Sequence, residues 1–152
     1  DGIKRGLIGE IIKRFEQRGL KIIGMKMVHV GEDFAKRHYR EDIAERHGEK
    51  VRNMLLDYIT EAPIVAMCVE GIGAVNVIRK IVGSTYPYES NIGTIRGDFA
   101  HMSKDYATKE DAHVRNLVHA SGTKEEADYE VALWFGNSEL HKYKSCHEDE
   151  IF

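Results

Sequence analysis

The chain opens with apolar residues at helical spacing. Residues 7–18 place apolar side chains on one stripe and charged side chains on the opposite side, which predicts an amphipathic helix that ends at Gly19. The stripe consists of Leu7, Ile8, Ile11, Ile12 and Phe15. Residues 20–30 are rich in Ile, Val and Met and predict a strand that ends at Gly31.

The middle of the chain continues this alternation. Dense charge over a thin apolar face predicts a largely exposed helix over 32–48. Apolar residues at helical spacing predict a shorter helix over 51–59. Residues 64–69 are continuously apolar, which is typical of a buried strand, and the pattern over 74–81 predicts another helix.

The pattern then becomes irregular. Residues 83–113 contain many Gly, Ser, Thr and Asn residues, and a loop of that length inside a domain is usually functional. Residues 116–119 predict a short strand. Thr123 and Glu126 match a capping box that begins a helix over 123–134.

These elements, in the order αβ(αα)βαβ, predict an α+β sandwich in which helices cover one face of an antiparallel sheet. One further strand at the start would complete the ferredoxin-like βαββαβ pattern. We therefore predict one ferredoxin-like domain over residues 1–152 whose first strand is missing from this sequence.

Composition narrows the function classes. The 152 residues include 22 Lys and Arg against 25 Asp and Glu, a net charge of −3, so no basic footprint for a nucleic acid is expected. Cys68 and Cys146 lie far apart in sequence and cannot form a disulfide framework. No apolar run approaches the ~20 residues of a membrane helix, so we expect a cytoplasmic protein.

Two patterns resemble binding motifs but fall short of them. Gly71 and Gly73 lie between a strand and a helix, but a dinucleotide fingerprint needs a third Gly where this chain has Asn76. We interpret them as an ordinary turn. The His and Cys residues near the C-terminus, and a His pair before them, match no strong zinc spacing. They are His141, Cys146 and His147, and His113 and His119.

The polar side chains around the long loop suit a phosphorylated small molecule. Guanidinium groups match phosphate oxygens, a hydroxyl adds a donor, and a neutral imidazole is a competent nucleophile. The residues in question are Arg79, Thr85, Arg96, Asn116 and His119. The alternative is that both arginines only pair with surface carboxylates, as exposed charges usually do.

Several stretches of the sequence resemble the nucleoside diphosphate kinase family. They are Asp1-Gly-Ile-Lys-Arg-Gly-Leu-Ile-Gly-Glu10, His38-Tyr39, Ser84-Thr-Tyr-Pro87, Gly93-Thr-Ile-Arg-Gly-Asp-Phe99, Arg115-Asn-Leu-Val-His-Ala-Ser121 and Glu130-Val-Ala-Leu-Trp-Phe135. They cover nearly the whole chain in the family's order, which makes the resemblance specific. His119-Ala-Ser-Gly122 is similar to archaeal members, where many other relatives have His-Gly-Ser-Asp.

The resemblance implies a catalytic centre. His119 would be phosphorylated on Nδ1 by the γ-phosphate of a nucleoside triphosphate, mainly ATP, and would pass that group to a nucleoside diphosphate by a ping-pong mechanism. Glu130 would accept the Nε2–H of His119, Ser121 would support Glu130, and Tyr39 would position the imidazole.

The resemblance also implies the nucleotide site. Arg79, Thr85 and Arg96 would hold the β- and γ-phosphates, and Asn116 would bind the ribose 3′-hydroxyl. Mg²⁺ would be carried by the nucleotide phosphates rather than by a protein cage. A homo-oligomer, hexamer or tetramer, is expected, with no membrane and no specific nucleic acid as partners.

The chain departs from the family at three places. Relatives have a strand ending in Lys-Pro just before the Asp-Gly with which this sequence starts. Val51 falls roughly where the base-stacking phenylalanine is expected, and such stacking contributes about 1–3 kcal/mol. Between Phe99 and His119 the chain is longer by about ten residues, an insertion that the loop entropy tolerates. These departures leave two alternatives: a catalytically impaired nucleotide-binding or regulatory relative, or a ferredoxin-like module that binds another small ligand.

Overall fold

The computed structural model describes residues 1–146 and 148–151. Its helices and strands are α1 (Ile8–Glu16), β1 (Lys21–Val28), α2 (Glu32–His38), α3 (Glu41–His47), α4 (Glu49–Thr60), β2 (Ile64–Glu70), α5 (Ala74–Val82), η1 (Pro87–Glu89), α6 (Ile95–Phe99), α7 (Lys104–Lys109), α8 (Lys124–Trp134), η2 (Asn137–Glu139) and α9 (Glu148–Ile151). The predicted helices over 7–18, 51–59, 74–81 and 123–134 and the strands over 20–30 and 64–69 are confirmed within a few residues.

The two described strands form an antiparallel sheet, β1 with β2. Lys21 lies opposite Glu70 at one end and Val28 opposite Ile64 at the other, with an irregularity between Ile22 and Gly24. Together with the helices, this antiparallel sheet agrees with the expected α+β, ferredoxin-like fold.

The segment after α8 crosses the sheet at Gly24. A Cβ at this position would lie 2.9 Å from Leu140 Cδ2 and 3.0 Å from the Glu139 carbonyl oxygen. Only glycine permits so close an approach of this segment to β1.

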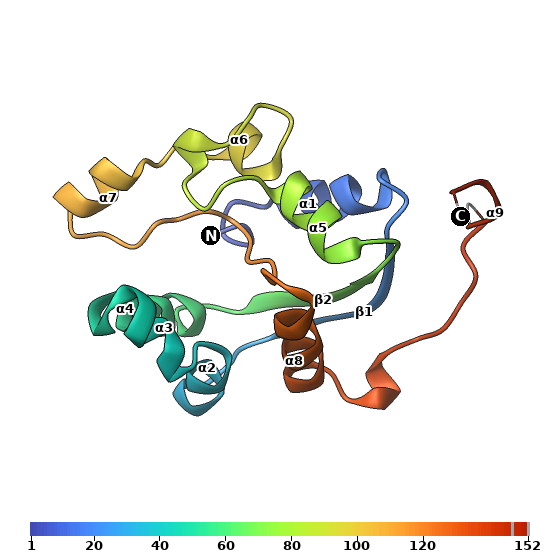
Figure 1. The fold of residues 1–152 in the computed structure, drawn as a ribbon, viewed down its shortest axis with the longest axis horizontal. Coiled ribbons are helices and arrows are strands. Elements are labelled where there is room, and N and C mark those ends of the chain that lie inside the picture. Colours follow the sequence, from blue (N-terminus) through green and yellow to red (C-terminus); the bar gives the residue numbers. More distant parts are fainter. Residues whose placement is uncertain (147, 152) are drawn as a thin grey trace.

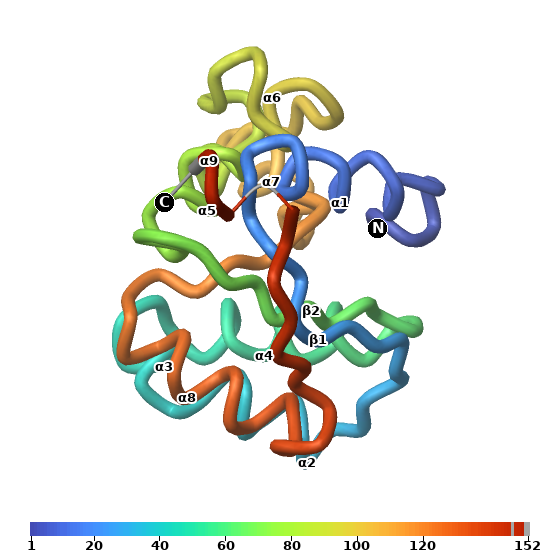
Figure 2. The backbone as a smooth tube through the Cα atoms, turned by 90° about the vertical axis from the view of Figure 1, so that its right-hand side faces the viewer, coloured from blue at the N-terminus to red at the C-terminus, as the bar shows by residue number. Residues whose placement is uncertain are grey.

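Helices lie on both sides of the strands (Figure 1). Helices α1 and α5 lie on one side, as predicted, and α8 lies on the other side, which the prediction of helices on one face did not include. Figure 2 shows the same division after a quarter turn, with α1, α5 and α6 above the strands and α2, α3, α4 and α8 below them.

The core follows this division. One buried cluster joins α1, α5 and α6 to the segment before the predicted catalytic histidine and comprises Ile11, Phe15, Leu20, Val82, Ile95 and Leu117. A second cluster joins α2 and α4 and comprises Val30, Ala35, Leu56 and Ile59, with Trp134 of α8 packed against it. The burial of α2 against α8 brings together two helices that are far apart in sequence.

The predicted single helix over 32–48 is two helices. Tyr39 has φ −98° and ψ 81°, outside the helical region, and Arg40 is extended. The carbonyl oxygen of Tyr39 accepts a hydrogen bond from Arg52 Nε of α4 at 2.9 Å. This bond draws the backbone away from helical geometry and ends α2 one residue before the predicted site residue Tyr39.

The predicted strand over 116–119 is wrong. Leu117 has φ 73°, a left-handed conformation that β-strands exclude. The backbone N–H of Val118 donates to the Asn116 carbonyl at 2.9 Å, so Leu117 is the central residue of a γ-turn with positive φ, a rare and strained type.

The predicted irregular segment 83–113 contains short helices. They are η1, α6 and α7, and the side chains of Thr94 and Ser103 cap the two α-helices.

The N-terminus of α8 differs in one contact from the predicted capping box. Thr123 caps α8 by accepting from the N–H of Glu126. Glu126 in turn accepts from the N–H of Gly122 at 2.5 Å, one residue before the position that a capping box requires.

Among residues 1–146 and 148–151, no helix combines the length and the apolar character that a membrane crossing requires.

Gly97 of α6 generates a stability prediction. A Cβ there would lie 2.1 Å from the Asn91 carbonyl oxygen, so Gly97→Ala forces the backbone at 90–91 to move and should lower the free energy of unfolding by about 1–3 kcal/mol. Gly9→Ala in α1 is the matched control, because a Cβ there meets nothing within 4 Å. It should raise the free energy of unfolding by about 0.5–1 kcal/mol. Urea unfolding measures both, and equal effects would contradict the prediction.

Candidate active site

A histidine and a carboxylate form the centre of the site. His119 Nε2 and Glu130 Oε1 lie 2.8 Å apart, and Ser121 Oγ donates to Glu130 Oε2. The Glu130 side chain is 11% exposed, whereas that of His119 is 44% exposed. An acceptor-only carboxylate at Nε2 fixes the proton there and leaves Nδ1 of a neutral His119 with a free lone pair.

The electrostatics of Glu130 favour the charged form. Burial alone would raise its pKa, but the hydrogen bond and charge of His119 and the hydrogen bond from Ser121 hold the pKa of Glu130 below its usual value. The carboxylate is therefore ionised at neutral pH and available to orient the imidazole.

The strained turn at Leu117 sets the direction of this histidine. The Leu117 N–H donates to the Asp1 carboxylate at 3.2 Å, and the Tyr58 hydroxyl donates to the same carboxylate oxygen. Burial raises the pKa of Tyr58 to about 12, so this hydroxyl keeps its proton. Asp1 thus stabilises the turn two residues before His119.

The predicted residue Tyr39 lies beside the imidazole. Its ring centroid is 6.2 Å from that of His119, at an interplanar angle of 86°. Burial raises the pKa of Tyr39 well above its usual range, so the phenol stays neutral. His38 is closer, with its ring centroid 5.0 Å from that of His119.

Arg96 is buried and anchors the loop. Its Nε donates to the Asn116 carbonyl at 3.0 Å, Nη2 to Val118 at 2.6 Å, and Nη1 to Gly83 at 3.3 Å and Ser84 at 2.8 Å. Burial and the charge of Arg79 lower the pKa of Arg96 to about 10, so it remains cationic at neutral pH. The guanidinium thus joins the first residues of the loop to the two carbonyls that flank the γ-turn. For Arg96, the alternative of pairing with a surface carboxylate does not apply.

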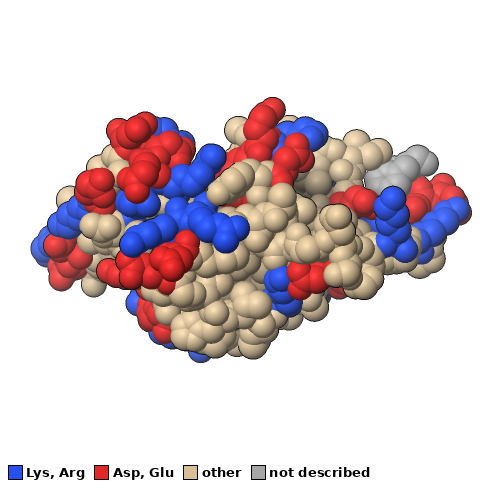
Figure 3. All heavy atoms as spheres, turned by 90° about the horizontal axis from the view of Figure 1, so that it is seen from below, with Lys and Arg blue, Asp and Glu red and all other residues tan. Residues whose placement is uncertain are grey.

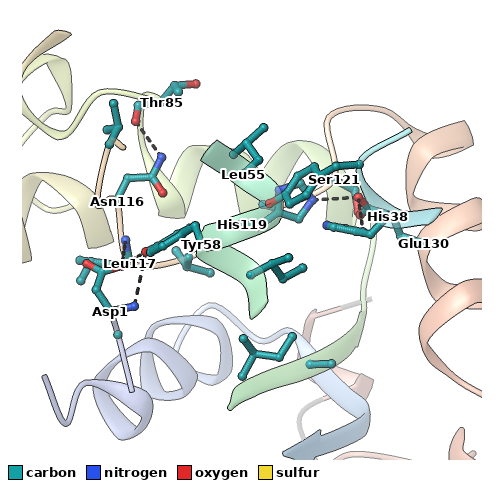
Figure 4. Close-up of a pocket in the computed structure, with 18 of the residues that line it drawn as sticks. Asp1, His38, Leu55, Tyr58, Thr85, Asn116, Leu117, His119, Ser121 and Glu130 are labelled. Carbon is teal, nitrogen blue, oxygen red and sulfur yellow. Dashed lines mark hydrogen bonds and ion pairs between the residues drawn. The ribbon is translucent and has the colours of Figure 1, made fainter. Parts of the chain in front are cut away.

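The other predicted ligand-binding residues lie along the same cleft (Figure 4). Asn116 Nδ2 donates to the Thr85 carbonyl at 2.9 Å, and Thr85 is exposed. Arg79 is exposed and makes a long contact of 3.4 Å with the Ala120 carbonyl. Among residues 1–146 and 148–151 it forms no other hydrogen bond or ion pair, so its remaining donors are available to a ligand in the cleft.

The cleft has a volume of about 1000 Å³ and runs from Asp1 and Tyr58 to His119 and Glu130. Val51 lies at its rim on α4 and is 41% exposed. The structure brings all nine predicted site residues to the lining of this cleft, which also includes apolar side chains of both core clusters.

One group of side chains has the composition of a metal site. His38, His119 and Glu130 bring their ligating atoms within 4.8 Å of one another, alone among the residues that the structure describes. Those atoms are already engaged, because His119 binds Glu130 and His38 Nδ1 accepts from Trp134 Nε1 at 3.2 Å. We therefore assign no metal to them. His147, one of the candidates near the C-terminus, lies outside the described residues.

Four residues of the site received no role in the sequence analysis: Asp1, His38, Tyr58 and Trp134. Asp1, His38 and Trp134 belong to the stretches that suggested the family, but their contacts join segments that are far apart in sequence.

On the face seen in Figure 3, basic and acidic side chains lie next to one another, so this face carries no extended patch of one sign.

Comparisons with known proteins show what the whole chain is similar to. The family model described as nucleoside diphosphate kinase matches residues 1–140. A nucleoside diphosphate kinase of Borreliella burgdorferi is 41% identical over all of this chain and 92% of its own length, and one of Pyrococcus abyssi is 46% identical over 94% of this chain and 84% of its own length.

Solved structures show the same similarity. A transition-state mimic of the Borrelia burgdorferi nucleoside-diphosphate kinase with bound vanadate and ADP has a TM-score of 0.96 at 41% identity, covering 99% of this chain and 90% of that one. A halophilic enzyme from Halobacterium salinarum in complex with CDP has a TM-score of 0.84 at 32% identity, covering 99% and 91%.

Arg96→Lys tests the anchoring of the loop. Lysine keeps the charge but replaces the planar five-donor fork with one ammonium, which cannot reach all four carbonyls. The free energy of unfolding should fall by about 2–4 kcal/mol. Arg79→Lys is the control at an exposed position and should change it by less than about 0.5 kcal/mol. Urea unfolding that finds the two variants equally stable would contradict the anchoring role.

His113 generates a pH prediction. Its ring lies 4.0 Å from that of Tyr58, and burial, followed by the charge of Arg115, lowers the pKa of His113 to about 4. Between this value and the unfolded value near 6.5 the unfolded chain binds more protons, so stability falls as the pH is lowered through this window.

His113→Phe keeps the ring and removes the titration. Between pH 6.5 and 4 this variant should lose about 1–3 kcal/mol less stability than the unsubstituted protein does. His101→Asn, at an exposed position, should retain the original slope. Urea midpoints at several pH values measure the difference, and parallel curves for His113→Phe would refute it.

Proposed function

The chain belongs to the nucleoside diphosphate kinase family, which transfers the terminal phosphoryl group of a nucleoside triphosphate to a nucleoside diphosphate, and we propose that His119 carries this group between the two nucleotides. The observation that carries the proposal is the 2.8 Å contact between His119 Nε2 and the buried Glu130 carboxylate. It leaves Nδ1 of a half-exposed imidazole as the nucleophile.

Two half-reactions follow. The Nδ1 lone pair bonds to the γ-phosphorus, the bond from that phosphorus to the bridging oxygen breaks, and the nucleoside diphosphate leaves. A β-phosphate oxygen of a second nucleoside diphosphate then attacks the phosphohistidine, the P–N bond breaks, and His119 regains its lone pair. Since Glu130 keeps the Nε2 proton in place throughout, the imidazole does not need to change tautomer.

The exposed donors along the cleft suit the phosphates. Arg79 and the Thr85 hydroxyl would bind the β- and γ-phosphate oxygens, where charge spreads during transfer. Asn116 would bind the ribose 3′-hydroxyl. Arg96 would add at most one N–H, since the others are directed to carbonyls, and its positive charge would stabilise the phosphates. Ser121 and Tyr39 would support Glu130 and the imidazole.

Magnesium fits this donor set only when nucleotide oxygens carry it. Mg²⁺ prefers oxygen ligands, and each oxygen of the carboxylate beside His119 already accepts a hydrogen bond, from His119 or from Ser121. When bound, Mg²⁺ would neutralise phosphate charge. The protein residues would bind the nucleotide around the ion rather than coordinate it through a carboxylate cage.

Base recognition is weak in this proposal. Val51 offers an aliphatic surface at the rim of the cleft in place of an aromatic ring, which gives base contact without base-specific hydrogen bonds. We expect ATP as the main donor, with broad use of nucleoside diphosphates as acceptors.

We further propose that residues 1–152 act as one domain, that the protein forms a hexamer or tetramer, and that it works in the cytoplasm.

Phosphotransfer tests the proposal directly. With Mg²⁺ and γ-labelled ATP, the protein should acquire an acid-labile, base-stable label, as expected of a phosphohistidine, and added GDP should convert the label to GTP. His119→Ala should take up no label. His101→Ala, at an exposed position away from the cleft, is the matched control and should label normally.

Other results of this labelling experiment would favour one of the alternative functions. No label on the unsubstituted protein, or equal label on His119→Ala, would overturn the role of His119. Label that GDP cannot remove would indicate the catalytically impaired relative. If the protein binds neither ATP nor GDP, the remaining alternative is a ferredoxin-like module that binds another small ligand.

A further inference from the structure

A second histidine occupies the hidden side of the His119–Glu130 pair. His38 is the last residue of α2, and its side chain is only 4% exposed. Its Nδ1 faces α8, where Glu130 and Trp134 stand four residues apart and therefore on the same face of the helix. Figure 4 shows His38, His119 and Ser121 gathered around Glu130.

The tautomer of His38 follows from its partner. Trp134 Nε1 can only donate, and it lies 3.2 Å from His38 Nδ1. His38 Nδ1 must therefore be an acceptor without a proton, and a neutral His38 carries its proton on Nε2. The indole is held in turn by Phe34, whose ring centroid lies 4.5 Å from that of Trp134.

The tautomer of His38 affects the nucleophile, because His38 Nδ1 lies near the carboxylate that orients His119. His38 Nδ1 is 3.6 Å from Glu130 Oε1, the same oxygen that His119 binds at 2.8 Å. A proton on His38 Nδ1 would make it a second donor to that oxygen. Sharing the negative charge of that oxygen between two donors would weaken its hold on the Nε2 proton of His119.

The surroundings keep His38 neutral. His119 and Glu130 are the titratable groups that face it from the neighbouring elements, and Tyr39 lies edge-on to it at 4.5 Å. Burial, then the charge of His119, lower the pKa of His38 to about 4, against the opposing effect of Glu130. At neutral pH the ring offers Glu130 no charge.

We propose that Trp134 is a positioning residue that acts through His38: its N–H occupies His38 Nδ1, so His38 cannot donate to Glu130 and the carboxylate remains available to His119. The inference deepens the proposed function and rests on His119 as the nucleophile.

The first test uses the unsubstituted protein without nucleotide. Nitrogen NMR of histidine labelled with ¹⁵N reports the protonation of each ring nitrogen. At pH 7 we expect His38 as the Nε2–H tautomer with Nδ1 bare, and His119 as the Nε2–H tautomer as well. A proton on Nδ1 of His38 would overturn the proposal whatever the variants do.

The second test releases His38. Trp134→Phe keeps an aromatic ring but removes the N–H, so His38 Nδ1 becomes free to donate to Glu130. We expect part of the His119 population to leave the Nε2–H tautomer. The rate of His119 phosphorylation by ATP with Mg²⁺ should fall about tenfold, and by the same factor at pH 6 and pH 8, because a neutral His38 changes its tautomer and not its charge.

A double variant separates positioning from packing. Trp134→Phe with His38→Phe has no second donor to Glu130, so it should recover most of the lost rate and the Nε2–H tautomer of His119. Tyr129→Phe is the control for a loosened α2–α8 contact, because the Tyr129 hydroxyl donates to the Arg37 carbonyl at 2.8 Å. It should leave the His119 nitrogen signals unchanged.

Every result decides the question. A single variant with normal rate and tautomers, or a double variant as impaired as the single one, would show that Trp134 only packs and would overturn the role of His38. If the unsubstituted protein takes up no label, the proposed function fails, whereas the nitrogen signals still decide whether His38 is held as inferred.

Discussion

The site depends on the hydrogen bonds that stabilise one buried carboxylate, that of Glu130. A charge such as that of Glu130 can remain in a largely dehydrated position only if hydrogen bonds replace its lost water. His119 and Ser121 supply those bonds, one to each oxygen. The same bonds that stabilise the charge also fix the imidazole, so the electrostatic requirement of the fold and the orientation of the nucleophile are met by one set of contacts.

A second constraint comes from the backbone around the loop. Leu117 adopts a conformation that an L-residue avoids, and it persists because neighbouring groups hold it from two sides. Asp1 accepts from its N–H, and Arg96 donates to the carbonyls of both flanking residues. The strain is thus balanced by charged hydrogen bonds, which are among the stronger ones in proteins, and the turn delivers His119 into the cleft.

The sequence predicted what depends on local pattern and missed what depends on distant partners. Helices such as α1 and α5 follow from apolar spacing, and the site residues followed from their resemblance to a family. The break at Tyr39 could not be read locally, because its cause is a bond from Arg52 in another helix. The strand expected over 116–119 failed for a similar reason. Its residues have strand-like composition, but contacts from Arg96 and Asp1 stabilise a turn at Leu117 instead.

The exposed fraction of each side chain at the site corresponds to its chemical role. The exposed fraction rises from 4% at the His38 side chain through 11% at Glu130 to 44% at His119. A nucleophile must be reached by phosphate, whereas the group that orients it acts more strongly in a medium of low dielectric constant. A neutral histidine behind the carboxylate completes this order, because burial costs an uncharged ring far less than it costs an ion. The gradient therefore places each ionisation state where its desolvation is least costly, with the buried carboxylate at the point where it orients the reacting atom.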